Sequence, residues 1–387
     1  LTTSRVNGLL GTNISTEIIE EILTSLHFSY TREGETLTIK VPTYRNDMTM
    51  DADVIEEIAR MYGYNHIPSS LPLMEMTKGA LTPVQSYVRM IRHLLTDLGL
   101  HEVMTYTLTS PSMVDDFNLF HHQDAVALML PIGEERSVTR KSLIPSLLQA
   151  INFNRAHSQK DVMIYEISHT YSKETEIQNL AIACSGMYHH VAWQQLQQKA
   201  DFYLLKGFVE TIFEKLGIKE SRYTLKPVEA NQQDFHPGRS GYIMMGNDIV
   251  GVIGEIHPRQ AKKYDVKDVY VAELNLSVLL NLKKPAIKFT EIPQYPSVTR
   301  DIALVMDKDI PVHDVVRSIC KVGQRLIVDT QIFDIYEGEH VASGQKSVAI
   351  ALTFQDATKT LDDTTINTMI EQILKVVEKD YGAHLRV

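Results

Sequence analysis

The hydrophobic positions near the start of the chain switch between helical and strand periods. A helical stripe follows Asn13 and Ser15, either of which can cap a helix, and it consists of Ile18, Ile19, Ile22, Leu23 and Leu26. Residues 28–31 and 36–41 then alternate around Gly34, as expected of a β-hairpin. A second helical stripe ends at Gly63 and consists of Val54, Ile55, Ile58, Ala59 and Tyr62. This pattern predicts a small, winged-helix-like α+β domain over residues 1–75, beginning in a strand and closed by a loop between Pro68 and Pro72.

The middle of the chain contains more strand patterns than helix patterns. Thr82-Pro83 opens a helix, because a threonine cap followed by proline suits the first helical turn. Further helices are predicted over residues 144–153 and 202–216. Strands are predicted over residues 103–108, 162–167, 180–186, 240–245, 249–253 and 270–274. Residues 76–288 are therefore predicted to form a larger domain, built on a mostly antiparallel sheet with helices packed on it.

The last part of the chain has a regular order of elements. Pro285, Pro293 and Pro296 indicate a linker, after which a strand (301–306), a helix (312–322) and two strands (327–335, 347–354) are predicted. A helix (364–380) and a strand (384–387) end the chain. This βαββαβ order predicts a ferredoxin-like domain over residues 289–387. The predicted fold class is thus α+β with several domains.

Composition and charge exclude several classes of protein. The formal net charge is −10, and both terminal domains are acidic, which argues against DNA binding and against a stand-alone nucleic-acid-binding role. We see neither a secretory signal nor an apolar run of the roughly 18 residues needed to span a membrane. Cys184 and Cys320 have no metal-type spacing and are predicted to be buried thiols in a reducing cytosol. The chain starts at Leu1 rather than Met, so we expect a fragment of a longer protein.

Four carboxylates can converge at the start of the second predicted helix. Asp47 precedes that helix, and Asp53, Glu56 and Glu57 lie in its first turns. Hard oxygen ligands of this kind suit Mg²⁺. The same residues also fit a solvated acidic face, favoured by the helix dipole and by pairing of Glu56 with Arg60. The spacing alone leaves both interpretations open.

The same stretch carries a resemblance to a known family. The sequences Pro42-Thr43-Tyr44-Arg45-Asn46-Asp47 and Asp53-Val54-Ile55-Glu56-Glu57-Ile58-Ala59-Arg60-Met61-Tyr62-Gly63-Tyr64 resemble the magnesium-associated module of bacterial phenylalanyl-tRNA synthetase beta subunits. The resemblance implies that Asp47, Asp53, Glu56 and Glu57 are Mg²⁺ ligands, and it favours the metal over the solvated face. We expect the ion to be structural, ordering the acidic helix and its loop.

The middle domain is similar to the class II synthetase catalytic fold, of which the beta subunit has a degenerate copy. The segment 135–140 lacks the Arg-then-Glu arrangement of the second class II motif. The segment 251–259 keeps only part of the pattern of the third class II motif. We see no convincing set of cations for ATP phosphates, so the domain is predicted to be catalytically silent. The segment His236-Pro237-Gly238-Arg239 is predicted to be a turn rather than an acid–base site. His189 and His190, near Trp193, point in different directions and are poor joint metal ligands; a surface or subunit-contact role is favoured.

The last domain also resembles a module of this family. The sequence Tyr295-Pro296-Ser297-Val298-Thr299-Arg300-Asp301-Ile302-Ala303, together with Thr360-Leu361-Asp362-Asp363, is similar to the ferredoxin-fold anticodon-binding module. This implies tRNA binding, although the third strand lacks the aromatic signature of an RRM. Candidate tRNA contacts, chosen by charge alone, are Arg300, Arg317, Lys321, Arg325 and Lys346; solvated surface cations are the alternative for each.

The resemblance as a whole implies a C-terminal portion of a non-catalytic beta subunit of phenylalanine–tRNA ligase. Such a chain would scaffold a catalytic alpha subunit in an α2β2 heterotetramer and bind tRNA(Phe), while the partner binds ATP and phenylalanine. The assembly would need Mg²⁺. This chain alone would neither activate phenylalanine nor edit mischarged tRNA. Two other classes remain: a Mg²⁺-dependent hydrolase or phosphotransferase using the Asp47 cluster, and an RNA-binding module without a synthetase partner.

Overall fold

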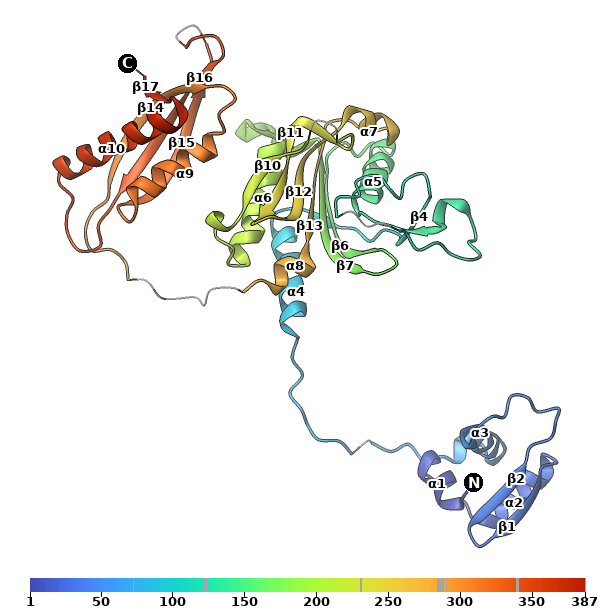
Figure 1. Cartoon of the computed structure of the whole chain (residues 1–387). Coiled ribbons are helices and arrows are strands. Elements are labelled where there is room, and N and C mark those ends of the chain that lie inside the picture. Colours follow the sequence, from blue (N-terminus) through green and yellow to red (C-terminus); the bar gives the residue numbers. More distant parts are fainter. Residues whose placement is uncertain are drawn as a thin grey trace. The chain divides into compact units, whose positions relative to one another are not determined.

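The computed structural model describes residues 1–71, 73–120, 124–229, 232–283, 289, 291–338 and 341–386. Pro72, Pro285 and Val387, which we placed in predicted loops and in the last strand, lie outside these residues. The chain divides into two units, Leu1–His93 and Leu94–Val387, which are described separately (Figure 1). Within the described residues, no helix is both long enough and apolar enough to cross a membrane.

The N-terminal unit packs three helices against a two-stranded hairpin. Its elements are α1 (Thr3–Leu10), α2 (Thr16–Ser25), β1 (Ser29–Glu33), β2 (Thr36–Lys40) and α3 (Asp51–Tyr62). Ser15 is the cap of α2, accepting a hydrogen bond from the Ile18 amide. The core is formed by apolar side chains of α2, β2 and α3, including Ile19, Leu23, Leu37, Ile55 and Ile58. The predicted α2, hairpin and α3 are confirmed.

The predicted strand at the very start of the chain is wrong, because helix α1 begins at Thr3. Thr2 caps this helix by accepting a hydrogen bond from the Arg5 amide at 3.2 Å. Only the first two residues are extended alongside β2: the Leu37 amide donates to the Leu1 carbonyl, and Thr2 bridges to Thr36. This short pairing explains the extended pattern in the sequence.

The second unit contains a seven-stranded sheet in the order β10-β11-β12-β13-β7-β6-β3. The strands are β3 (His101–Glu102), β6 (Val162–Tyr171), β7 (Glu176–Ser185), β10 (Thr224–Pro227), β11 (Phe235–Met245), β12 (Asp248–Ile256) and β13 (Val269–Asn275). Every neighbouring pair is antiparallel except β3 with β6. The predicted antiparallel sheet is therefore confirmed.

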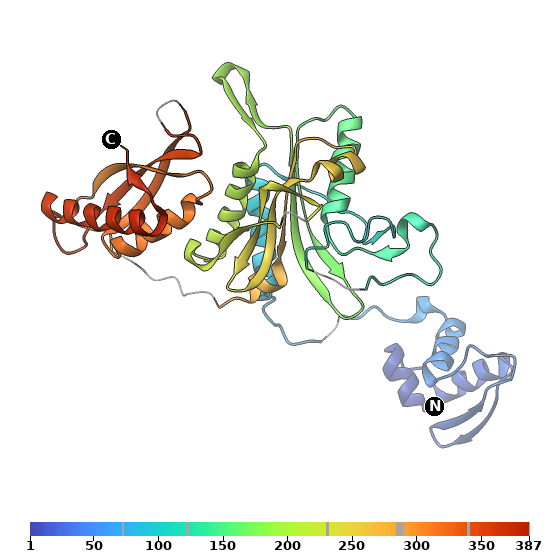
Figure 2. The ribbon, with the colours of Figure 1, turned by 45° about the horizontal axis from the view of Figure 1, so that its top comes forward.

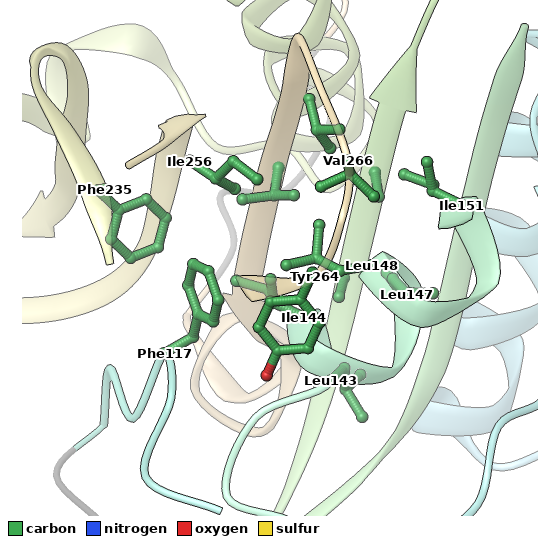
Figure 3. Close-up of a cluster of buried hydrophobic side chains, with 14 of the residues drawn as sticks. Phe117, Leu143, Ile144, Leu147, Leu148, Ile151, Phe235, Ile256, Tyr264 and Val266 are labelled. Atoms are coloured by element: carbon green, nitrogen blue, oxygen red, sulfur yellow. The ribbon is translucent and has the colours of Figure 1, made fainter. Parts of the chain in front are cut away.

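Helices lie on both faces of this sheet (Figure 2). They are α5 (Ile144–Ala156), α6 (Phe202–Lys215), α7 (Pro258–Lys263) and α8 (Leu276–Asn281). Figure 3 shows Leu147, Leu148 and Ile151 of α5 in a buried cluster with Phe117, Phe235 and Tyr264. The rings of Phe117 and Phe235 meet edge to face, with 5.3 Å between their centroids, an arrangement favoured by aromatic pairs. The loop around Phe117 is thereby fastened to the sheet.

Two local predictions in this sheet are wrong. The strand predicted over residues 103–108 is absent except at its last residue, because β3 ends at Glu102 and β4 (Leu108–Thr109) begins only at Leu108. β4 pairs with β5 (Val138–Thr139). Between β3 and β4, the Thr105 amide and hydroxyl donate to the side chain of Glu166 rather than to a strand. The predicted turn His236-Pro237-Gly238-Arg239 lies within β11, where the register shifts between Phe235 and Ser240. The Ser240 hydroxyl donates to the His236 carbonyl, which accommodates the irregularity inside the strand.

Several short elements were not predicted from the sequence. A hairpin formed by β8 (Met187–Val191) and β9 (Leu196–Lys199) follows β7. Single 3-10 turns span Tyr64–His66, Glu134–Arg136, Ala192–Gln194 and Glu220–Arg222. The predicted helix at residue 83 is confirmed as α4 (Pro83–Asp97), which spans the division between the two units. Its start is fixed by reciprocal hydrogen bonds between Thr82 and Gln85, the arrangement of a capping box.

The end of the chain forms the predicted βαββαβ domain. Its elements are β14 (Val298–Asp307), α9 (Val312–Gly323), β15 (Ile327–Tyr336), β16 (Gln345–Phe354), α10 (Asp363–Tyr381) and β17 (His384–Leu385). The strand order β15-β16-β14-β17 is that of a ferredoxin-like fold. One face of the sheet packs against α9 and α10 through residues such as Ile350, Ile319 and Ile373. Gly382 ends α10 in a left-handed conformation at φ 64°.

The prediction that both cysteines are buried is half right. Cys184 lies in β7 and is fully buried, whereas Cys320 on α9 is exposed. Val315 and Ile319 face the core of the last domain. Because consecutive helical residues are turned by about 100°, Cys320 points away from that core.

Candidate functional site

The predicted metal cluster is organised around the side chain of Arg45. Its guanidinium donates to both carboxylate oxygens of Asp47, with the shortest contact, from Nη2, at 2.7 Å. The same Nη2 lies 3.2 Å from Oε1 of Glu57 on α3. The other oxygen of Glu57 accepts from Nη2 of Arg60 at 2.5 Å. Two of the four predicted ligands are therefore joined to each other through a guanidinium.

The other two predicted ligands lie apart from this bridge. Oδ2 of Asp53 accepts from the amides of Thr49 and Met50, at 2.7 and 2.8 Å, and so closes the start of α3. Glu56 is exposed on the outer side of the helix. The structure therefore brings Asp47 and Glu57 together, gives Asp53 a capping role, and leaves Glu56 in solvent.

These contacts lower the pKa values of three of the carboxylates. Hydrogen bonds from Arg45 lower the pKa of Asp47, and those from the Thr49 and Met50 amides lower the pKa of Asp53. Arg60, and after it Arg45, lowers the pKa of Glu57. The carboxylates are thus held ionised by protein donors.

A resident Mg²⁺ does not fit this arrangement of donors. Among the described residues, no three His, Cys, Asp or Glu side chains form a group that could hold a metal ion. Asp47 and Glu57 are engaged by Arg45 and Arg60, Oδ2 of Asp53 is engaged by backbone amides, and Glu56 is exposed on the outer side of α3. These contacts do not support Mg²⁺ coordination by Asp47, Asp53, Glu56 and Glu57, which stays a prediction, and no chemical step is assigned to it.

Arg140, the last residue of the degenerate second motif, is buried in the middle domain. Nη1 of Arg140 lies 3.0 Å from Oε1 of Glu166 on β6, and the two side chains are only 2% and 3% exposed. The guanidinium also donates to the hydroxyl of Thr105 and to the carbonyl of His169. Arg140 is thus an internal structural residue.

A second buried polar group was missed by the sequence analysis. Glu273 on β13 accepts from the Ser142 hydroxyl at 2.6 Å, from the Leu143 amide at 3.0 Å and from Nδ2 of Asn179 at 3.3 Å. Burial raises the pKa of Glu273 to about 7, although these hydrogen bonds oppose the rise. The signal in the sequence was a charged residue inside the apolar strand pattern at 270–274, which indicates a paired buried side chain.

Other cations that suggested chemistry are also engaged by protein contacts. Arg239 pairs with Glu255 at 2.7 Å, and Arg259 donates to Gln233. The guanidinium of Arg136 lies over the ring of Tyr106, 3.3 Å from its centroid. His189 and His190 are neighbours on β8, and Trp193 at the tip of that hairpin is 81% exposed.

The middle domain carries an exposed apolar segment next to β5. Residues 126–132 run beside it, with hydrogen bonds from the Leu128 amide to the Ser137 carbonyl and from the Thr139 amide to the Val126 carbonyl. Its large side chains face solvent, and Met129 and Leu130 are more than nine-tenths exposed. Exposing several large apolar side chains to water is unfavourable, and exposed apolar patches of this kind mark interaction sites.

The five candidate tRNA contacts do not form one patch. Arg300 pairs with Asp363 at 2.7 Å. Nζ of Lys346 donates to the carbonyls of Lys308 and Ile310, and burial lowers its pKa. The remaining three are exposed: Arg317 and Lys321 lie one turn apart on α9, and Arg325 follows this helix.

The sheet face opposite α9 and α10 presents polar and small side chains. Ala303 and Asp334 both oppose Ala349, and Asp301 opposes Ala351. Directly opposed residues share a face of the sheet. All of these residues therefore lie on the face away from the core residue Ile350. Tyr336 lies two residues beyond Asp334 on the same face. The guanidinium of Arg386 lies 5.2 Å from the centroid of the Tyr336 ring. Sequence analysis did not single out this pair.

Family models match three consecutive parts of the chain. Residues 1–64 match the tRNA synthetase B5 domain, residues 67–276 the phenylalanyl tRNA synthetase beta chain CLM domain, and residues 293–386 the ferredoxin-fold anticodon binding domain. A solved pyrrolysyl-tRNA synthetase structure from Desulfitobacterium hafniense covers 50% of this chain and 66% of its own, at 17% identity and a TM-score of 0.39.

Curated relatives match the chain from end to end. The phenylalanine–tRNA ligase beta subunit of Geobacillus kaustophilus is 41% identical over 100% of this chain and 48% of its own length. The beta subunits of Bacillus cereus and Bacillus subtilis are each 37% identical, over 100% and 99% of this chain and 48% of their own lengths. The chain thus spans about half the length of these relatives. It belongs to the phenylalanyl-tRNA synthetase beta chain family.

Proposed function

We propose that this chain is the C-terminal part of a non-catalytic beta subunit of phenylalanine–tRNA ligase. It scaffolds a catalytic alpha subunit, in an α2β2 assembly, and contributes to binding tRNA(Phe). The partner subunit binds ATP, phenylalanine and the Mg²⁺ that accompanies ATP. We infer three domains: a winged-helix-like domain over residues 1–75, a silent class II synthetase-like domain over 76–288, and an anticodon-binding domain over 289–387.

The internal position of Arg140 carries the non-catalytic part of the proposal. Phosphoryl and adenylyl transfer need cations aimed at the phosphates. Arg140 instead directs its charge at Glu166, with both side chains buried, and moving it to a ligand would leave Glu166 unpaired in the interior. Arg239 and Arg259 are also engaged by protein groups. These contacts support a domain that does not hold ATP.

The exposed segment 126–132 supports a partner subunit. Stable interfaces bury a core of apolar side chains behind a polar rim. Met129 and Leu130 supply such side chains, and the carboxylates of Glu134 and Glu135 and the guanidinium of Arg136 follow them in the sequence. We therefore place part of the contact with the alpha subunit at residues 126–132.

The last domain offers two surfaces for tRNA. Arg317, Lys321 and Arg325 supply positive charge on and after α9, which suits phosphate contacts that set orientation. The opposite face presents Tyr336, an aromatic ring on which an unpaired base can stack, and the carboxylates of Asp301 and Asp334, which can accept from base amino groups. We propose that cations near α9 attract the tRNA and that the open face contacts unpaired bases.

The experiment that tests this function is phenylalanine-dependent ATP–pyrophosphate exchange. It is run with this chain alone, with a separately produced catalytic alpha subunit alone, and with the two mixed. We expect no exchange by the chain alone, and co-elution with exchange on mixing. Exchange by this chain alone would show that the middle domain holds a working ATP site and would overturn the proposal. Failure of the two subunits to co-elute would overturn the scaffolding role.

A further inference from the structure

We propose that Arg45, rather than a divalent cation, joins the loop of residues 42–50 to helix α3. The family resemblance implies a metal at this place, but the side chains found there are already joined by a guanidinium. The inference concerns the folding of the N-terminal unit and does not rest on the proposed synthetase function.

The geometry of Arg45 is that of a bridging group. Nε and Nη2 face Oδ1 and Oδ2 of Asp47 at 3.0 and 2.7 Å, a paired contact that matches the planar fork of a guanidinium. Nη2 also reaches Oε1 of Glu57, two turns into α3, at 3.2 Å. One side chain therefore links a loop carboxylate to a helix carboxylate.

The position of Arg45 is fixed by its surroundings as well. Its guanidinium carbon lies 5.9 Å from the centroid of the ring of Phe28, a core residue. Its carbonyl accepts from the amide of Met48, whose side chain is buried in the same core. The loop is thus anchored at both Arg45 and Met48, with the charged head of Arg45 between the two carboxylates.

The charges around Arg45 disfavour a second cation at the same place. Glu57 is shared between Arg45 and Arg60, and its side chain is only 14% exposed. Asp53 already accepts from two amides of the loop. A divalent ion between Asp47 and Glu57 would lie directly against the positive charge of Arg45, and like charges repel. We infer that the guanidinium and a divalent cation exclude each other.

The test is hydrogen exchange of residues 1–387 as one chain, read by mass spectrometry at peptides covering residues 42–62, with a chelator and with added Mg²⁺. The variants are Arg45→Met, which removes the bridge, and Arg45→Lys, which keeps the charge but not the fork. The matched control is Arg5→Met, which removes another arginine–aspartate pair of the same unit, that of Arg5 with Asp51.

We expect the wild-type exchange of these peptides to be the same with chelator and with Mg²⁺. Arg45→Met should exchange about tenfold faster or more at Thr49 and Met50, since a charge-assisted bridge is removed. Added Mg²⁺ should slow the exchange of this variant, because Asp47 and Glu57 are then exposed to the ion. Arg45→Lys should exchange faster than wild type as well, and this variant gives the readout if Arg45→Met unfolds the unit. Slower exchange of the wild type in Mg²⁺ would overturn the proposal. Exchange rates of the Arg45 variants equal to that of Arg5→Met would also overturn it.

Discussion

Ser142 donates a 2.6 Å hydrogen bond to Glu273, across 131 positions of the chain. Ser142 lies just before α5, and Glu273 lies near the middle of β13. The neighbouring Leu143 amide donates to the same carboxylate at 3.0 Å. One buried side chain therefore fixes the start of α5 on the central sheet: it accepts from the Ser142 hydroxyl and from the Leu143 amide, a donor that the start of a helix leaves unpaired.

Replacing Glu273 by Gln should flatten the pH dependence of stability. Burial raises the pKa of Glu273 from 4.5 to about 7, so the folded state binds this proton more tightly than the unfolded state does. The folded state therefore loses stability as the pH rises from about 4.5 to about 7, by about 3 kcal/mol in all. Glu273→Gln keeps the shape and an acceptor oxygen but cannot ionise. Urea unfolding across this pH range should show that the free energy of unfolding of the variant rises relative to that of the wild type as the pH rises.

The control for this prediction is Glu56→Gln, which removes a carboxylate from an exposed position of α3. Its pH profile should follow that of the wild type. A Glu273→Gln profile that also follows the wild type would show that Glu273 ionises as readily in the folded chain as in the unfolded one.

Replacing Arg140 by Met should destabilise the middle domain strongly. The change leaves Glu166 buried without its charged partner, and breaking one side of a buried pair costs about 3–5 kcal/mol. The double change Arg140→Met, Glu166→Gln should recover part of this loss, since no unpaired charge remains. Both are measured by urea unfolding near neutral pH. Equal losses in the single and double variants would mean that packing, rather than charge, accounts for the effect.

Elements with a strong period were predictable from the sequence, because their hydrophobic faces specify them locally. Helix α3 and the βαββαβ order of the last domain follow from such faces and from the glycines that end them. The prediction of a strand over residues 103–108 was wrong because Thr105 donates hydrogen bonds to Glu166, which lies 61 positions away in the sequence. Such a contact depends on the tertiary fold and leaves no local signal.

The candidate site was predictable only in part, for the same reason. The spacing placed Asp53, Glu56 and Glu57 on α3, and Asp47 before it. It did not reveal that Arg45 reaches between Asp47 and Glu57, because a long side chain from a loop can turn to several neighbours. Lys346 similarly looked like a surface cation, yet its ammonium group donates to two carbonyls.

Charged substitutions in the segment 126–132 should separate binding from folding. Met129→Glu and Leu130→Glu change side chains that are almost fully exposed, so the free energy of unfolding should change by less than about 0.5 kcal/mol. Co-elution with the alpha subunit should disappear or become much weaker, since each carboxylate would be buried in the interface without a partner. Leu71→Glu, at another exposed apolar position, is the control and should co-elute normally. Co-elution by all three variants would place the subunit contact elsewhere.

The exposed cations near α9 should contribute to tRNA affinity through charge alone. Replacing Arg317, Lys321 or Arg325 by Gln should weaken binding of tRNA(Phe) and reduce the slope of log affinity against log salt by up to about 1 for each phosphate that is no longer neutralised. Filter binding at several salt concentrations measures both quantities. Lys375→Gln, at an exposed position of α10, is the matched control and should keep the wild-type slope. Unchanged slopes in all the α9 variants would place the phosphate contacts on another surface.

Lys346 should behave differently from these three residues, although all were chosen by charge. Its Nζ donates to the carbonyls of Lys308 and Ile310 at 2.8 and 2.7 Å, so Lys346→Met should lower the thermal midpoint by leaving two carbonyls without a donor. At a temperature where the variant is folded, its salt slope for tRNA should equal that of the wild type. A reduced slope with an unchanged midpoint would instead make Lys346 a phosphate contact, and would show that its hydrogen bonds give way when tRNA binds.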